Sequence, residues 1–123
     1  MKVSITKKFE FEAAHKLLGH PGKCKNLHGH SYKLEVTISS RKLNDQGMVM
    51  DFGDLKKIVN KWVIDKFDHS YLNDFFPIPT AEQMIKWIYL KLDVFLQDNF
   101  DRGLTLEKVR LYETSNSYAE VVR

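Results

Sequence analysis

The chain has 123 residues, of which 43% are hydrophobic, and carries a formal net charge of +3. This length predicts one domain over residues 1–123, with enough apolar residues for a core. The small charge is spread among acidic residues, which argues against a nucleic-acid partner. A single cysteine excludes an internal disulfide, and we find neither a secretory signal nor an apolar run of membrane-spanning length. We therefore expect a cytoplasmic protein without a membrane partner.

The first part of the chain is predicted to form two strands. Apolar and polar residues alternate over residues 2–12 and again over 31–39, which is typical of half-buried strands. The segment 13–29 between them contains glycine and proline and is expected to be a long loop, which in a compact domain is usually functional. A turn at 44–47 and a short extended piece at 48–50 follow.

Two amphipathic helices are predicted next, separated by an irregular segment over 68–79. Asp51 is expected to cap the first helix, and Thr80, three residues before Gln83, has the spacing of a capping box for the second. The apolar stripe of the first helix comprises Leu55, Ile58, Val59, Trp62 and Val63. That of the second comprises Met84, Ile85, Ile88, Leu92, Phe95 and Leu96.

Two further strands are expected over 107–113 and 117–122. The order ββααββ predicts an α+β fold in which a four-stranded antiparallel sheet is covered on one face by both helices. The other face and both edges of such a sheet still need cover, and edges joined between copies into a barrel would supply it. Homo-oligomerisation is therefore expected.

Three of the five histidines are placed to converge on one metal ion. His28 and His30 are two residues apart on extended backbone, so their side chains share a face. His15 closes a strand that is expected to pair with the one beginning at Ser31. Three imidazoles with an open fourth position are the ligand set of a catalytic zinc, although imidazole also suits iron, nickel and copper. His20 has no such partner and is expected to be exposed.

Cys24 lies four residues before His28, close enough to act beside such a metal without being a ligand. Lys23 and Lys25 flank it, and their positive charge favours an exposed thiolate that can serve as a general base. The alternative for a lone cysteine is a small buried hydrophobic residue.

Asp68-His69 and Glu113 are weaker candidates, because an exposed imidazole and a solvated strand-end acid explain them better when each is considered alone. Adjacent side chains on extended backbone diverge, so Asp68 can orient His69 only if the backbone turns there. Contact of this pair with Cys24 would have to come from the fold or from another subunit. The Glu113 carboxylate is able to accept two parallel hydrogen bonds from an amidine-like edge.

Six motifs, taken together and in order, resemble the superfamily of 6-pyruvoyl- and 6-carboxy-tetrahydropterin synthases over nearly the whole chain. They are Phe11–His15, Cys24–Tyr32, Gly47–Phe52, Asp68-His69 with Leu72-Asn73, Pro79–Glu82 and Tyr112–Thr114. The resemblance implies the tunnelling fold, in which subunits trimerise into a β-barrel and two trimers stack as a homohexamer with active sites between subunits.

The resemblance also implies roles for individual residues. It implies zinc on His15, His28 and His30, and a catalytic set of Cys24, Asp68 and His69. It implies that Glu113 anchors the amino-pyrimidinone edge of a pterin, in a pocket lined by the backbone around Thr80 and Ala81.

Within the superfamily, a zinc-dependent carbon–carbon lyase is favoured: 6-carboxy-tetrahydropterin synthase of the queuosine route to a modified tRNA base. Its substrate is 7,8-dihydroneopterin triphosphate, and its products include acetaldehyde and triphosphate. The spacing Cys-x3-His-Gly-His and the pair Asp51-Phe52 resemble this type. The alternatives are the pyruvoyl enzyme, which eliminates triphosphate without cleaving the side chain, and a non-catalytic metal-binding scaffold. Cys24 argues against a subgroup that uses glutamate, and a single cysteine argues against GTP cyclohydrolase.

Overall fold

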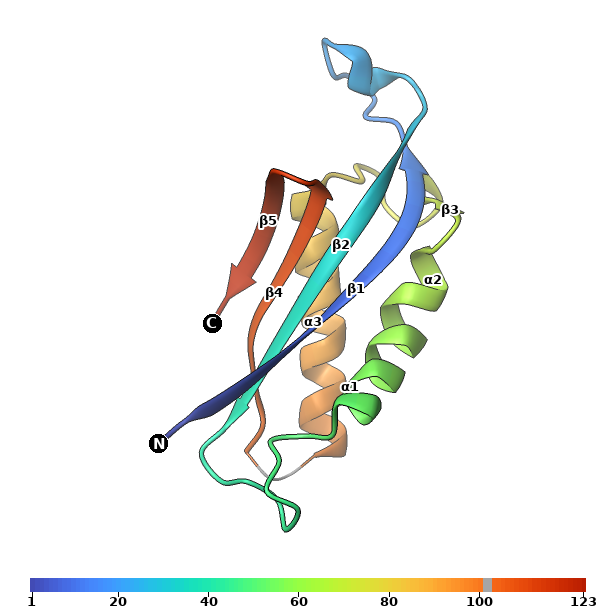
Figure 1. Cartoon of the computed structure of the whole chain (residues 1–123). Helices are drawn as coiled ribbons and strands as arrows, with labels where there is room; N and C mark the ends of the chain where they lie inside the picture. Colours follow the sequence, from blue (N-terminus) through green and yellow to red (C-terminus); the bar gives the residue numbers. More distant parts are fainter. Residues whose placement is uncertain (101–102) are drawn as a thin grey trace.

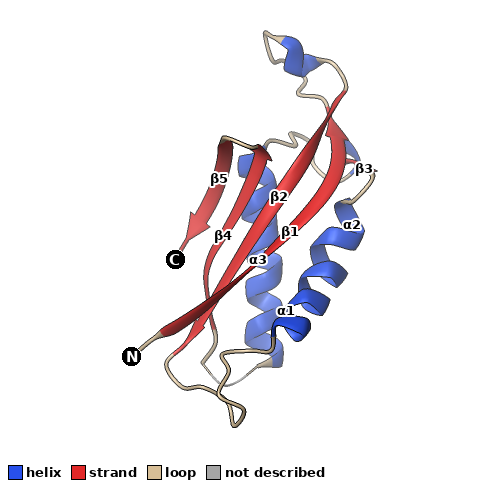
Figure 2. Ribbon diagram, in the orientation of Figure 1, coloured by secondary structure: helices blue, strands red, loops and turns tan. Residues whose placement is uncertain are grey.

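The computed structural model describes residues 1–100 and 103–123 (Figure 1). The strands are β1 (Val3–His15), β2 (His28–Ser40), β3 (Ser70–Tyr71), β4 (Thr105–Thr114) and β5 (Ser117–Val122). The helices are α1 (Phe52–Val59), α2 (Asp65–Phe67) and α3 (Ala81–Asn99), with a π-helical turn η2 (Asn60–Ile64) and two 3-10 turns, η1 (Lys23–Lys25) and η3 (Leu72–Asp74). The predicted α+β class is confirmed. The helices α1, α2 and α3 form a layer on one face of the sheet (Figure 2).

The sheet has five strands in the order β3-β1-β2-β4-β5, so the expectation of four strands was wrong. The four long strands pair antiparallel, but β3 pairs parallel with β1, with Ala13 opposite Ser70. The sheet is therefore mixed. Two residues are too few to carry a periodic signal, and β3 pairs only because the end of α2 delivers the chain beside β1.

The first two strands are longer than expected. Residues 13–15 and 28–30 extend the β1–β2 ladder by three pairs, which end with His15 opposite His28. The predicted loop over 13–29 was therefore wrong at both ends and spans only 16–27. Ala, Gly and His at these positions do not alternate in hydrophobicity, so the ladder continues through main-chain pairing where the side-chain pattern has ended. The piece at 48–50 is not a strand.

The core lies between the sheet and the helices, and both predicted helix caps are present. The Asp51 side chain accepts hydrogen bonds from the backbone N–H of Gly53 and Asp54, and the Thr80 hydroxyl accepts one from Gln83. The fully buried sheet residues include Phe11, Tyr32, Leu34, Ile38 and Leu111, and the buried helix residues include Leu55, Val59, Val63, Phe67, Met84, Ile88, Leu92 and Leu96. Of the predicted stripes, Ile58, Trp62 and Phe95 are only partly buried. None of the described helices has the length and apolar content to cross a bilayer.

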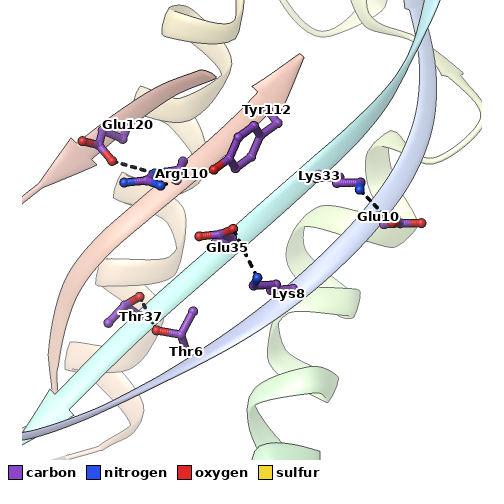
Figure 3. Close-up of polar contacts among 9 residues, drawn as sticks. All are labelled: Thr6, Lys8, Glu10, Lys33, Glu35, Thr37, Arg110, Tyr112 and Glu120. Carbon is purple, nitrogen blue, oxygen red and sulfur yellow. Dashed lines mark hydrogen bonds and ion pairs between the residues drawn. The ribbon is translucent and has the colours of Figure 1, made fainter. Parts of the chain in front are cut away.

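The face of the sheet opposite the helices carries polar cross-strand pairs (Figure 3). One row crosses four strands with alternating charge and comprises Lys8, Glu35, Arg110 and Glu120. Within it the Lys8 Nζ–Glu35 Oε2 distance is 3.9 Å and the Arg110 Nε–Glu120 Oε1 distance is 2.8 Å. Neighbouring rows hold Thr6 with Thr37 and Glu10 with Lys33. The row begins and ends at the two sheet edges, and in the described chain residues 3–12 of β1 and all of β5 have a partner strand on one side only.

Candidate active site

The β1–β2 ladder gathers three histidines at one end of the sheet. His15 and His28 are directly opposite each other, and His30 follows on the same face. Their ring centroids lie 4.6 Å (His15–His28), 5.1 Å (His15–His30) and 4.8 Å (His28–His30) apart. One ring nitrogen from each lies within 4.8 Å of the others, which is close enough for all three to hold one metal ion. The structure thus brings together the predicted metal ligands.

Two main-chain carbonyls fix the orientation of two of these rings. The Nδ1 atom of His15 lies 2.7 Å from the carbonyl oxygen of Pro79, and that of His28 lies 2.7 Å from the carbonyl oxygen of Asn26. A carbonyl oxygen only accepts, so each Nδ1 carries the hydrogen and each neutral ring leaves a lone pair on Nε2. These two Nε2 atoms face each other at 3.0 Å. Two facing lone pairs repel, whereas a cation bound by both removes the repulsion, so the arrangement fits a metal site.

The third imidazole is also suited to a cation. The Nε2 atom of His30 is buried without a hydrogen-bond partner in the part of the chain that the structure describes, and it lies 3.6 Å from Oε1 of Glu113. Burial lowers the pKa of His30; the Glu113 carboxylate opposes this shift, and the other two histidines add to it. A neutral imidazole with an unused nitrogen is the form that binds metals. The donor set as a whole matches a three-histidine site with an open position.

Glu113 connects the histidines to a neighbouring cavity of about 480 Å³. The cavity is lined by Ala81, Glu82, Glu113, Ser117, Tyr118, Ala119 and Glu120. Ala81 begins α3 and follows Thr80, the cap residue, and Pro79, whose carbonyl holds His15. The predicted pocket residues Glu113 and Ala81 therefore line one cavity next to the metal ligands, and Thr80 adjoins it. The carbonyls of Pro79 and Asn26 were missed, because a main-chain acceptor leaves no side-chain signal in the sequence.

The backbone turns at Asp68-His69, as orientation of the imidazole requires. His69 has a φ of 59°, in the left-handed region that non-glycine residues seldom adopt. This brings Nδ1 of His69 to 3.1 Å from Oδ1 of Asp68, while the same carboxylate oxygen accepts from the backbone N–H of Glu12 at 2.9 Å. Asp68 therefore orients His69, whose side chain is 80% exposed.

The remaining predicted residues, His69 and Cys24, are outside the group of three histidine ligand atoms within one chain. His69 lines a cavity of about 410 Å³ together with Glu12, Ser31 and His30, and the side chains of Glu12 and Ser31 alternate with the ligand positions and so face the other side of the sheet. Cys24 is half-buried in η1, on an arm that projects beyond the end of the sheet (Figure 1). In the described part of the chain, neither residue has a hydrogen bond or ion pair to the three histidines. His20 is exposed, as expected, and its ring accepts from the Gly22 N–H.

Comparison with known proteins agrees with this arrangement. The family model of 6-pyruvoyl tetrahydropterin synthase matches residues 4–123. The chain belongs to this family. It is 45% identical over 122 residues to the 6-carboxy-5,6,7,8-tetrahydropterin synthase of Synechocystis, covering 94% of this chain and 89% of the relative. It is 34% identical to the enzyme of the same name from Rickettsia typhi, covering 97% and 99%.

Solved structures confirm the fold of the family. The 6-pyruvoyl tetrahydropterin synthase of Caenorhabditis elegans superposes with a TM-score of 0.84 at 28% identity, covering all of this chain and 96% of that one. The resemblance inferred from the six motifs is thereby confirmed, and the chain is a member of an enzyme family, the tetrahydropterin synthases.

Acid titration of Asp68 is expected to reduce the stability of this family member. The Glu12 N–H, followed by the interactions with His69, holds the pKa of Asp68 below its ordinary value of 3.8. A carboxyl group whose pKa is lowered by folding stabilises the protein above its unfolded pKa, and this contribution is lost as pH falls through the folded pKa. We expect Asp68→Asn, which cannot ionise, to lose less stability than the wild type below about pH 4. Thermal midpoints measured from pH 6 downward test this.

The matched control is Asp45→Asn, at an exposed turn. It should follow the wild-type acid profile. Parallel profiles for Asp68→Asn and the wild type would contradict the expectation.

Proposed function

We propose that this chain is a 6-carboxy-5,6,7,8-tetrahydropterin synthase, a single catalytic domain over residues 1–123. It would convert 7,8-dihydroneopterin triphosphate and water to 6-carboxytetrahydropterin, acetaldehyde and triphosphate, on the queuosine route. One observation carries the proposal: three imidazoles converge on one point beside a cavity that contains Glu113, in a chain of this family. Its curated relatives that bear the carboxy name are similar along nearly their whole length.

The metal of the proposal is zinc, held by His15, His28 and His30. When bound, a zinc ion supplies Lewis acidity that stabilises negative charge on substrate oxygens. The protein contributes fixed ring orientations, through the Pro79 and Asn26 carbonyls.

Glu113 orients the substrate. Its carboxylate would accept two hydrogen bonds from the 2-amino group and ring N–H of the pterin, a pairing like that of carboxylate with guanidinium. Because this carboxylate lies 3.6 Å from His30, the substrate's side chain is then directed toward the metal ligands. A fixed ring keeps the reacting carbon atoms at one place, which lowers the entropic part of the barrier.

Cys24 and His69 would move protons on the substrate's side chain. The Cys24 thiolate removes a proton from a carbon of the substrate's side chain. His69, held by Asp68, accepts or returns the second proton of that side chain. Triphosphate leaves, and addition of water with cleavage of the carbon–carbon bond releases acetaldehyde. Each proton lost from carbon is taken by a side chain with a lone pair.

The site would be completed by further copies of the chain, and we propose a homohexamer built from two trimers. Within one chain His69 is outside the group of ligand atoms and its side chain is 80% exposed, although His30 lines the same cavity. The row of charged residues ends at the unpaired edges of the sheet, with Lys8 on β1 and Glu120 on β5. Because these two charges are opposite, a second copy can continue the alternating row. The arm that carries Cys24 exposes Leu18 and Leu27, which a neighbouring subunit would cover.

Turnover of the proposed substrate tests the function directly. Purified protein loaded with zinc and given dihydroneopterin triphosphate is expected to release one acetaldehyde for each 6-carboxytetrahydropterin identified by mass. The pyruvoyl product without acetaldehyde would support the runner-up, the activity named for the Caenorhabditis elegans relative. Metal binding and assembly without loss of pterin would support a non-catalytic scaffold.

A further inference from the structure

Tyr32 carries a buried polar group that the proposed mechanism does not use. Its side chain is fully buried, and its hydroxyl has no hydrogen-bond partner among residues 1–100 and 103–123. Buried tyrosine hydroxyls usually have one, because burying an unpaired polar group is unfavourable. When a buried hydroxyl without a partner lies next to a binding site, its hydrogen-bond partner is expected to be the ligand or a side chain that moves toward the hydroxyl when the ligand binds.

The ring of Tyr32 lies beneath the metal ligands. It stacks on Phe11 with a centroid distance of 5.0 Å, and it contacts the rings of His30 and His15 edge-on at 5.6 Å and 6.4 Å. These contacts fix the ring on the helix-covered face of the sheet, so that its position is set before any ligand binds.

Tyr32 and Glu113 both lie beside His30. Lys33 pairs with Tyr112 across β2 and β4, and Tyr32 and Glu113 are the next residues along the two strands. Glu113 Oε1 lies 3.6 Å from Nε2 of His30, and the ring of Tyr32 lies 5.6 Å from the His30 ring. The Tyr32 phenol is near enough to the Glu113 carboxylate for the two groups to interact electrostatically, and a tyrosine hydroxyl is a hydrogen-bond donor at neutral pH.

We propose that Tyr32 is a positioning residue of the pterin site, whose hydroxyl donates a hydrogen bond to the Glu113 carboxylate when the pterin is bound. This inference rests on the proposed function. A carboxylate has about four lone-pair positions, and the pterin edge uses two, so one remains for a phenol. A third donor fixes the plane of the carboxylate, and the two bonds to the substrate then form without further loss of side-chain freedom.

Tyr32→Phe removes only the oxygen atom and tests the proposal. We expect KM for dihydroneopterin triphosphate and Kd for neopterin, followed by its fluorescence, to rise about tenfold, the effect of a hydrogen bond to a charged group. The value of kcat should change less, and zinc content should stay the same. The thermal midpoint should be equal or higher, because an unpaired buried hydroxyl has been removed.

Tyr112→Phe is the matched control, since Tyr112 lies one position along on the other face, where its hydroxyl accepts from Arg110 (Figure 3). It should leave KM and neopterin affinity unchanged. The coupling is tested by a double-mutant cycle: in a Glu113→Ala background, Tyr32→Phe should have no further effect on neopterin affinity.

Unchanged neopterin affinity in Tyr32→Phe, or loss of its zinc, would overturn the proposal. The proposed function fails separately if the wild-type protein binds neopterin but does not consume dihydroneopterin triphosphate. In that case the neopterin affinities still decide the role of Tyr32. Should Tyr32→Phe fail to fold, a crystal structure of the wild type with neopterin decides. The Tyr32 Oη should then lie about 3 Å from the Glu113 carboxylate, and a clearly longer distance rejects the hydrogen bond.

Discussion

His28→Ala is expected to lose the bound metal without unfolding the protein. The side chain lies at the end of β2 and is only partly buried, so its removal leaves no cavity in the core. Loss of one of three ligands should weaken zinc binding by more than the roughly 10- to 100-fold that follows removal of a group supporting a ligand. Elemental analysis after dialysis should find about one zinc per chain in the wild type and almost none in the variant.

After removal of the metal, His28→Ala is expected to be at least as stable as the wild type. The Nε2 atoms of His15 and His28 lie 3.0 Å apart, and the Nδ1 atom of each ring is bonded to a carbonyl oxygen, so with no cation between them the two Nε2 lone pairs would repel. His28→Ala removes the repulsion altogether. After chelation its thermal midpoint should therefore equal or exceed that of the wild type, whereas with zinc the wild type should be the more stable.

His20→Ala is the matched control for this prediction. His20 is an exposed loop histidine whose ring accepts from Gly22, and it is remote from the cluster of ligand atoms. The variant should keep its zinc and should respond to chelation as the wild type does. Equal zinc content in His28→Ala and His20→Ala would reject the ligand set.

Local patterns in the sequence were sufficient to predict the helix caps and the convergence of three histidines. Asp51 and Thr80 cap their helices because the side chain reaches a free N–H only two or three residues away. The pair His28 and His30 shares a face because extended backbone alternates. His15 joins them because a strand that pairs antiparallel with β2 ends opposite His28. Each of these predictions needs only the chain within an element or its nearest partner strand.

The features that were missed depend on tertiary placement. The parallel strand β3 forms only where α2 ends beside β1, and Pro79 reaches His15 although 64 residues separate them. The π-helical turn η2 was also missed: it adds a residue to the turn, so that Phe67 follows the predicted core residues Leu55, Val59 and Val63 at the same four-residue interval. No alternation of hydrophobic residues encodes these contacts.

Cys24→Ala is expected to abolish turnover while zinc and neopterin still bind. Cys24 is outside the cluster of ligand atoms, and its carbonyl, not its thiol, holds the arm through Leu17, so its removal leaves both binding sites intact. Loss of a general base lowers kcat by about 10²- to 10⁴-fold. Full activity in this variant would exclude Cys24 as the base. Lys23→Ala, the neighbouring substitution on the same turn, should keep most of the activity and controls for disturbance of the arm.

A mixing experiment shows whether Cys24 acts beside another subunit's imidazole. His69 is exposed at the end of α2, whereas Cys24 lies in η1 on an arm beyond the end of the sheet, so we expect the Cys24 and the His69 of one active site to belong to different chains. Cys24→Ala and His69→Ala should each be inactive alone. Refolded together, they should regain activity, because some mixed sites receive an intact thiol from one chain and an intact imidazole from another. If both residues of a site came from one chain, no mixed site would contain the two together, and the mixture would stay as inactive as its components.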